Sequence, residues 1–490
     1  MPEDPAISVC MIVKDEEKSL PLLLESVKGL ADEIIIVDTG SSDRTVGIAE
    51  RSGAKVYRFE WCDDFSAARN ESIRHATGDY ILWLDADDVL EKEYHGAIKE
   101  HIKNNCGKAA FLKLVNIESD NVSEAIQLRI FPNIKGLQFT GRVHEQISIA
   151  LKKKNVPVAL CDAKIKHYGY QEKELLRKKL ERNKRLHELE IEEDPENFYA
   201  LFFLGRTLKG LGERERSLAC LERVIDLGAG YDDPEVMVVA LLDMAAILCE
   251  LGREQEAVSL LSKRLYMFNS SSLITFTLGE LYFKLKRYEE SYNLLLPVRK
   301  ASFNNEFVPV DVRTTRLNLF RYLGISSLFT HDYRTAGECF REALAIDQGN
   351  DEIYHYLSLA MEKGGDIEGA IESCRKGLEC SGEDSFLRKR IFILNIRRDD
   401  LEGALMEHEK LNGHAGDIDV LAGMFLIGCR KLNMAAINDY YRLIQSGLSL
   451  LPKDFPDGLD TIRERFALLE EYQALDIFES AISHLLTISG

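Results

Sequence analysis

GDYILWLDADDVL, residues 78–90, is a short apolar run that ends in three carboxylates. The apolar residues 80–84, bounded by glycine and acids, predict a buried strand. Asp85 and Asp87 lie two residues apart, so both can bind one hard cation, which prefers oxygen ligands. Such a triplet also arises about once by chance in a chain of this length, and Asp417-Ile418-Asp419 is another, without a strand before it. The neighbours of Asp85 must therefore decide whether the stretch is a site.

The length and composition predict a multidomain globular protein. A chain of 490 residues exceeds a single hydrophobic core, and 45% apolar with 29% charged residues is typical of soluble proteins. There is no run of eighteen apolar residues and the first five residues are acidic, so we expect neither a membrane span nor a signal peptide, and hence a cytoplasmic location. The net charge of −19 argues against nucleic-acid binding. The ten scattered cysteines show no zinc spacing and are expected to be reduced.

The first ninety residues alternate between predicted strands and predicted helices. Strands are expected at 7–13, 33–37, 55–59 and 80–84, with helices at 20–30, 45–52 and 65–76 between them. This alternation indicates βαβ units and a parallel sheet covered on both faces. Ligands of such sheets bind beyond the carboxyl ends of the strands. Carboxylates follow three of the four strands there, which predicts a site: Asp15 or Glu16, Asp38, and the Asp85 cluster.

Three ordered blocks carry a resemblance to a known family. They are ISVCMIVKDEEKSLPLLLESV (7–27), DEIIIVDTGSSDRTVGIAERSGAKV (32–56) and FSAARNESIRHATGDYILWLDADD (65–88). Together they resemble the nucleotide-sugar half of a family 2 glycosyltransferase. The resemblance implies an α/β GT-A domain, expected at residues 1–170, that transfers sugar from a nucleotide-sugar, with UDP-sugar as the expected donor and Mn²⁺ or Mg²⁺ as the cofactor.

The resemblance also implies roles for individual residues. The end of the first strand and the acids after it would hold the nucleotide, Asp38 the base, and the Arg-Asn pair the ribose and diphosphate. The DxD segment would reach the ribose and a divalent metal, which stabilises the dianionic leaving group as a Lewis acid. The implied nucleotide-binding residues are Val13, Asp15, Glu16, Asp38, Arg69, Asn70, Asp85 and Ala86, with Asp87 on the metal. Asp88 is either a further metal ligand or the cap of a helix expected at 89–104.

The remaining catalytic candidates lie in FTGRVHEQI (139–147) and AKIKHYGY (163–170). An inverting transfer needs a general base for the acceptor, and a carboxylate near the sugar suits that role. The Val-His-Glu block resembles one in a branch of the family, so Glu145 is our choice, with Asp120 or Asp162 as fallback. His144 and His167 are candidate metal ligands or diphosphate contacts, since neutral imidazole binds cations and imidazolium binds phosphate.

Two other enzyme classes fit parts of the motif less well. DADDVL resembles the nucleophile motif of haloacid-dehalogenase-type phosphatases, but that motif normally sits on a first strand, and here three strand-helix units precede it. Sugar-phosphate nucleotidylyltransferases share the fold but have a glycine-rich loop after the first strand, where this chain has Met-Ile-Val-Lys-Asp-Glu.

The rest of the chain is expected to be helical. Residues 171–195 read as a basic linker helix whose charges we interpret as a solvated face rather than a binding patch. Residues 196–410 resemble a tetratricopeptide array of six segments, with steps of 34 residues from Ala336 to Ala370 and from Ala370 to Ala404. Residues 411–490 are expected to be an irregular helical cap or a homodimer surface.

An array of this kind presents a concave surface for polypeptides, so a protein or peptide acceptor is expected. The architecture resembles peptide S-glycosyltransferases of the sublancin type. A cell-surface saccharide or lipid-linked glycan is the alternative acceptor, and a repeat scaffold with an inactive transferase domain is the alternative class.

Overall fold

A computed structural model describes residues 5–411 apart from 118–121, 169–172, 231–232, 269–270, 304–310 and 382–384, together with positions 420, 423, 424 and 427. The chain divides into two compact units. The first comprises Met1–Ile274 with Ser302–Val310, and the second Thr275–Ala301 with Asp311–Gly490. The domain boundaries predicted above stay predictions, and the expected C-terminal cap or homodimer surface, like Asp417 and Asp419, lies almost entirely outside the described residues.

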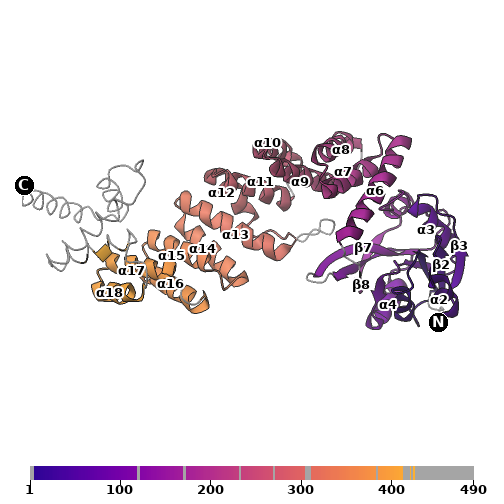
Figure 1. Ribbon diagram of the computed structural model, residues 1–490, viewed down its shortest axis with the longest axis horizontal. Coiled ribbons are helices and arrows are strands. Elements are labelled where there is room, and N and C mark those ends of the chain that lie inside the picture. The colour runs from indigo at the N-terminus through magenta and orange to yellow at the C-terminus, as the bar shows by residue number, and fades with distance from the viewer. Residues whose placement is uncertain are drawn as a thin grey trace, which may run out of the picture. The chain divides into compact units, whose positions relative to one another are not determined.

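The first unit contains an eight-stranded mixed sheet (Figure 1). Its spatial order is β3 (Lys55–Arg58), β2 (Glu33–Asp38), β1 (Ile7–Val13), β4 (Tyr80–Trp83), β7 (Val122–Pro132), β6 (Ala109–Ile117), β8 (Val158–His167) and β5 (Asp88–Leu90). The parallel arrangement expected for the first four strands is confirmed. Beyond β4 the sheet is mixed: β7 runs antiparallel to both β4 and β6, β8 is parallel to β6, and β5 is antiparallel to β8.

The strand order reverses direction at β1. From β1 the chain builds outward through β2 and β3, and then returns to place β4 on the other side of β1. A crevice opens beyond the carboxyl ends of the two strands at such a switch point, and ligands of α/β sheets bind there. Val13 ends β1 and Asp85 follows β4, so both lie at this position.

Five helices cover the sheet. Helices α1 (Leu20–Ser26), α2 (Thr45–Arg51) and α4 (His95–Asn104) bury Leu23, Ala49 and Ile98 in one core. Helices α3 (Phe65–Arg74) and α5 (Ser148–Lys153) pack against a second core that contains Ile81 and Leu151. The sheet is therefore covered on both faces, as expected.

Gly78 allows β4 to pass close to β1. A Cβ added at this residue would lie 2.7 Å from Ser8 Oγ and 2.9 Å from the Ala6 carbonyl oxygen. Real Cβ atoms do not approach other atoms so closely, so only glycine fits before the strand that carries the Asp85 cluster.

The prediction of a helix at 89–104 is wrong for its first residues. Asp88–Leu90 forms the short strand β5, which pairs antiparallel with β8 so that Asp88 lies opposite His167. A single 3₁₀ turn (Lys92–Tyr94) follows, and α4 starts only at His95. The apolar Val89 and Leu90 fit either period over so short a run. Asp88 is therefore not a helix cap.

The chain after the sheet is helical, beginning with the long helix α6 (Lys173–Glu193). Among the described residues, antiparallel pairs follow one another along the chain, which agrees with the six expected repeats. They are α7 (Phe198–Leu211) with α8 (Arg214–Leu227), α9 (Pro234–Glu250) with α10 (Glu254–Arg264), α11 (Ser272–Lys284) with α12 (Tyr288–Val298), α13 (Val312–Phe329) with α14 (Tyr333–Ile346), α15 (Asp351–Lys363) with α16 (Ile367–Ser381), and α17 (Ser385–Arg397) with α18 (Leu401–Lys410).

Small residues sit where the two helices of a pair approach. A Cβ on Gly279 would lie 2.5 Å from Leu295 Cδ2, and one on Gly324 would lie 2.7 Å from the ring of Phe340. The recurring small residue of the second helix is fully buried in all six described pairs, at Ser217, Ala257, Ser291, Ala336, Ala370 and Ala404. The small positions read from the sequence are thus contacts between helices, as repeat packing requires.

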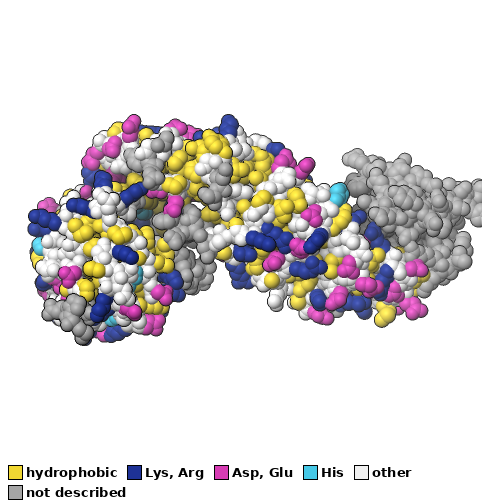
Figure 2. All heavy atoms as spheres, turned by 180° about the vertical axis from the view of Figure 1, so that it is seen from behind, with side chains coloured by type: hydrophobic (Ala, Val, Ile, Leu, Met, Phe, Trp, Pro, Cys, Tyr) yellow, Lys and Arg dark blue, Asp and Glu magenta, His cyan; other side chains and the backbone are white. Residues whose placement is uncertain are grey.

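The surface of the second unit mixes charges of both signs. Figure 2 shows Lys and Arg side chains intermingled with Asp and Glu there, and pairs such as Arg299 with Glu338 and Arg321 with Glu352 join successive helix pairs. None of the helices in the described part of the chain is both long enough and apolar enough to cross a membrane.

Candidate active site

A pocket of about 680 Å³ opens at the switch point of the sheet. We call it the switch-point pocket. It is lined from the end of β1, the end of β4, helix α3, the loop before α5, the end of β8 and helix α6. The lining residues are Ile12, Val13, Lys14, Glu16, Thr39, Trp61, Phe65, Arg69, Trp83, Asp85, Ala86, Asp87, Gln127, Val143, His144, Glu145, His167, Lys179, Arg182 and Asn183.

Arg69 connects two of the predicted site carboxylates. Its Nη2 donates to Asp85 Oδ1 at 2.7 Å, and its Nε donates to Glu145 Oε1. The guanidinium lies 4.4 Å from the ring centroid of Trp83, which packs against its flat face. Arg69 is buried on helix α3, so it holds the strand end and the loop before α5 in a fixed relation.

Arg129, from β7, also contacts the Asp85 cluster. Its Nη2 lies 3.3 Å from Asp85 Oδ2 and its Nη1 lies 3.1 Å from Asp88 Oδ2. The Arg129 guanidinium also packs on the ring of Trp83, 4.0 Å from its centroid. Burial alone would favour a protonated Asp85, but Arg69 and Arg129 hold the pKa of Asp85 well below its usual range.

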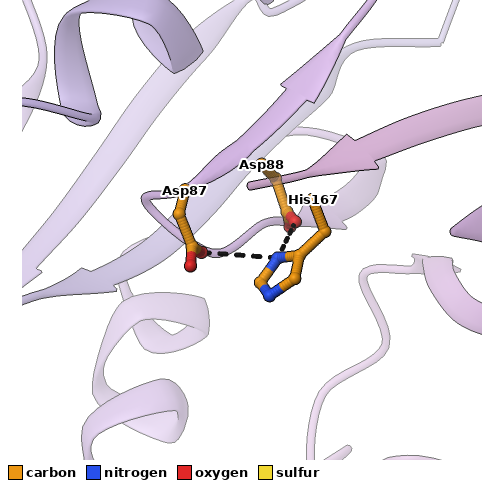
Figure 3. Close-up of side chains that lie close together, drawn as sticks. All are labelled: Asp87, Asp88 and His167. Carbon is orange, nitrogen blue, oxygen red and sulfur yellow. Dashed lines mark hydrogen bonds and ion pairs between the residues drawn. The ribbon is translucent and has the colours of Figure 1, made fainter. Parts of the chain in front are cut away.

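Asp87, Asp88 and His167 form a compact group (Figure 3). The two aspartates come from the turn into β5, and His167 ends the neighbouring strand β8. His167 Nδ1 lies 2.9 Å from Asp88 Oδ1 and 3.5 Å from Asp87 Oδ1. The hydrogen bond with Asp88, opposed by burial and aided by both carboxylates, raises the pKa of His167.

The three side chains differ in how far their charges are already compensated. Asp88 Oδ2 accepts a hydrogen bond from the Asp85 amide at 2.8 Å and forms an ion pair with Arg129. The negative charge of Asp88 is therefore already compensated within the protein. Asp87 has His167 as its nearest partner, and burial, with a smaller contribution from Asp85 and Asp88, raises its pKa to about 6. A buried carboxylate that lacks a full partner fits a divalent cation.

This donor set suits the metal that the sequence implied. One ligand atom from each of Asp87, Asp88 and His167 lies within 4.8 Å of the others, and carboxylate and imidazole ligands bind divalent ions. Asp87 and His167 line the pocket, whereas Asp88 is buried behind them. The side chains that face the pocket could therefore hold the ion, and Asp88 would orient His167.

Comparison with known proteins agrees with this geometry. Residues 8–163 match glycosyl transferase family 2 and residues 198–227 match the tetratricopeptide repeat. Residues 8–163 are a glycosyl transferase family 2 domain. The sheet, its switch point and the Asp85 cluster all belong to this family 2 domain, and the repeat match begins at helix α7.

Curated proteins resemble parts of this chain. A TPR repeat-containing protein of Synechococcus elongatus is 35% identical over 239 residues, which is 47% of this chain and 58% of that protein. The glycosyltransferase SunS of Bacillus subtilis is 29% identical over 260 residues, 51% of this chain and 60% of that one. A glycosyltransferase of Rickettsia bellii is 39% identical over 93 residues, 19% of this chain and 31% of that one. The chain thus spans little more than half the length of the first two relatives.

Several predicted nucleotide-binding residues do not line the pocket of the family 2 domain. Asp15 accepts hydrogen bonds from the Ser42 amide and hydroxyl, at 2.7 and 3.0 Å. Asp38 accepts from the Ser41 amide at 3.1 Å, and Asn70 exchanges hydrogen bonds with the backbone of Phe139. These contacts fix the loops that border the pocket, and nucleotide contacts by these residues stay predictions.

The base candidates have different surroundings. Glu145 lines the pocket and is paired with Arg69. Asp162 is exposed on β8 and lies 3.6 Å from Lys113 Nζ, away from the pocket lining. Asp120 lies outside the described residues. Glu145 is thus the candidate that the structure brings together with Asp85 and Asp87.

His144 lines the pocket but is not brought to the aspartate group. Its ring stacks on Phe203 of helix α7 with centroids 4.5 Å apart and on His187 of α6 at 5.5 Å. Its backbone takes a positive φ of 54°. Burial, with help from His187 and nearby arginines, lowers the pKa of His144 to about 4. This environment is that of a neutral packing residue.

The sequence interpretation missed four residues at this site. Lys179, Arg182 and Asn183 line the pocket from α6, although the charges of this helix were interpreted as a solvated face. Arg129 was missed because it interrupts an apolar strand, Leu128–Phe131, yet a charged residue there implies a buried partner. The basic pattern of α6 carried no signal for which residues face the sheet domain.

Proposed function

We propose that the chain is a metal-dependent, inverting glycosyltransferase that moves a sugar from UDP-sugar to a protein or peptide. One observation supports this most strongly. A family 2 domain has, at the switch point of its sheet, a pocket in which Arg69, Asp85, Asp87, Glu145 and His167 meet. That combination supplies acids for a cation, an arginine that orders them, and a carboxylate for proton transfer.

The proposed reaction is a displacement at the anomeric carbon. The acceptor nucleophile forms a bond to the anomeric carbon. At the same time the bond between that carbon and the β-phosphate oxygen breaks, and its electron pair leaves with UDP. Glu145 takes the proton of the acceptor as general base. Asp87 and His167 would hold Mn²⁺ or Mg²⁺, which when bound would supply Lewis acidity toward the diphosphate.

The protein acceptor is proposed from the repeats. The relatives include proteins named as a TPR repeat-containing protein and as a glycosyltransferase, each aligned over about half of this chain. Tetratricopeptide arrays present concave surfaces of the kind that hold polypeptides, and here the repeats continue directly from α6, which lines the pocket.

Two measurements test the proposal. Hydrolysis of UDP-sugars with and without Mn²⁺ should reveal slow, metal-dependent release of UDP, and calorimetry should detect UDP binding. Failure of UDP to bind would favour a scaffold with an inactive domain. Incubation of labelled UDP-sugars with cell lysate should then label protein, whereas label in saccharide or lipid fractions alone would contradict the acceptor.

A further inference from the structure

We infer that helix α6 forms one wall of the donor site, with Lys179 and Arg182 as cations that bind the diphosphate of the nucleotide. The inference rests on the proposed function. It concerns residues beyond the family 2 match, which ends at residue 163.

The helix is fixed against the family 2 domain. Arg185 Nη1 donates to Asp63 Oδ2 at 2.8 Å, and Glu190 Oε1 accepts a hydrogen bond from the Arg142 amide at 2.7 Å. Leu186 is fully buried between these contacts. The Arg185 ion pair and the Glu190 hydrogen bond lie on either side of Leu186 along the helix. Together these contacts fix the middle of α6 beside the pocket.

The cations of the pocket fall into two groups. Arg69 is paired with Glu145 and Asp85, and its guanidinium therefore has little charge left to offer a ligand. Lys179 and Arg182, by contrast, have no ion-pair partner among the residues that the structure describes, a property shared within the lining by Lys14 at the end of β1. Their charges remain available to an anion.

Arg182 is also held in place without being neutralised. Its guanidinium lies 4.9 Å from the ring centroid of Phe65, and its Nη2 donates to Asn183 Oδ1 at 2.9 Å. Stacking on an aromatic ring fixes the plane of the guanidinium and leaves other N–H groups free, which suits bidentate binding of phosphate oxygens.

The carboxylates of the pocket explain why such cations are needed. Asp85, Asp87, Glu16 and Glu145 make the pocket rich in carboxylates, and a diphosphate that enters it gains a further negative charge as the bond to the sugar breaks. Cations on α6, which line the same pocket, would stabilise this charge on the leaving UDP. Without them, Lys14 would be the remaining lining cation that has no ion-pair partner among the described residues.

Calorimetry of the full chain with UDP, UMP and uridine, each with Mn²⁺, tests the inference. Charge-assisted hydrogen bonds to phosphate are strong, so Lys179→Ala and Arg182→Ala should each weaken UDP binding by about tenfold. Uridine affinity should not change, and the advantage of UDP over UMP should shrink. Arg182→Lys should recover part of the loss because it restores the charge.

Arg177→Ala provides the matched control. It removes the same charge from an exposed position of α6 that does not line the pocket, and should leave all three affinities unchanged. UDP binding that is equal in wild type, Lys179→Ala and Arg182→Ala would overturn the inference alone. Absence of UDP binding in the wild type would overturn the proposed function as well. An equal loss of UDP affinity in Arg177→Ala would show that the effect comes from net charge, and would contradict a binding site on α6.

Discussion

Arg129 Nη1 lies 3.1 Å from Asp88 Oδ2, and the two side chains are 2% and 0% exposed. This ion pair lies beneath the turn that carries Asp85 and Asp87. Removal of one partner from a buried pair leaves the other charge without compensation, which is far more costly than loss of an exposed pair. The pair is therefore expected to determine the stability of the turn.

Arg129→Met should destabilise the family 2 domain by about 3–5 kcal/mol, and Arg129→Met with Asp88→Asn should be less destabilised than the single variant. Urea unfolding followed by tryptophan fluorescence measures this, because both tryptophans of the chain, Trp61 and Trp83, lie in this domain. Arg74→Met, which breaks an exposed pair with Glu71, is the control and should cost under about 1 kcal/mol. Equal losses in the two variants would contradict the structural role.

Asp87→Asn should reduce UDP-sugar hydrolysis by at least about 100-fold, since metal-assisted charge stabilisation contributes several kcal/mol to such reactions. Chelation by EDTA should have a similar effect on the wild type and little further effect on the variant. Asp162→Asn, which changes an exposed carboxylate of β8, should behave as wild type. Activity that persists in Asp87→Asn would remove this residue from the metal site.

Glu145→Gln should lower the turnover of acceptor by about 100- to 10,000-fold, the range for loss of a general base. The amide keeps the size of the side chain, so UDP affinity should change far less than turnover. Glu71→Gln on the surface of α3 is the control. A variant that loses UDP affinity and turnover together would instead assign Glu145 to the positioning of Arg69, its ion-pair partner.

The stability of the family 2 domain should fall on acidification partly through His144. Its pKa in the folded protein, about 4, lies below the usual value, so the unfolded chain takes up a proton first as the pH falls. Stability is then lost between about pH 6.5 and pH 4. His144→Phe should show a smaller decrease in melting temperature over this range, and an unchanged slope would rule out the contribution.

Gly279→Val should destabilise the second unit by about 1–3 kcal/mol, as overpacking does, because even a Cβ would lie 2.5 Å from Leu295 Cδ2. Circular dichroism at 222 nm should show an earlier helical transition while the tryptophan signal of the family 2 domain stays in place. Gly349→Ala, where nothing lies within 4 Å of the added Cβ, should leave both transitions unchanged.

The sequence predicted the parts of the site that depend on local pattern. Residues 80–84 lie between a glycine and carboxylates, and alternation of strands with helices places Val13 and Asp85 at one sheet edge, so the switch-point pocket could be located before the structure was known. The repeated small residues, such as Ala336 and Ala370, similarly predicted the helix pairs.

Other parts depend on contacts that local pattern does not encode. A helix cap was one of the two expectations for Asp88, because the pairing of Asp88–Leu90 with β8 joins residues about 80 positions apart in the chain and is not encoded locally. Helical periodicity predicted α6, but it does not say what a polar face lies against, so Lys179 and Arg182 were interpreted as solvated. His144 and His167 were equivalent as candidates by residue type, and only the fold separates the ring stacked on Phe203 from the one beside Asp88.

The position of α6 has a practical consequence for exchanging repeats between relatives. A chimera joined at residue 170, where the family resemblance suggests a seam, would replace the helix that borders the pocket and could change nucleotide affinity along with acceptor choice. A junction after Leu211, at the end of α7, would keep Lys179, Arg182 and the packing of Phe203 on His144 intact. Recombination at that later junction would exchange the repeats and keep every residue that lines the switch-point pocket.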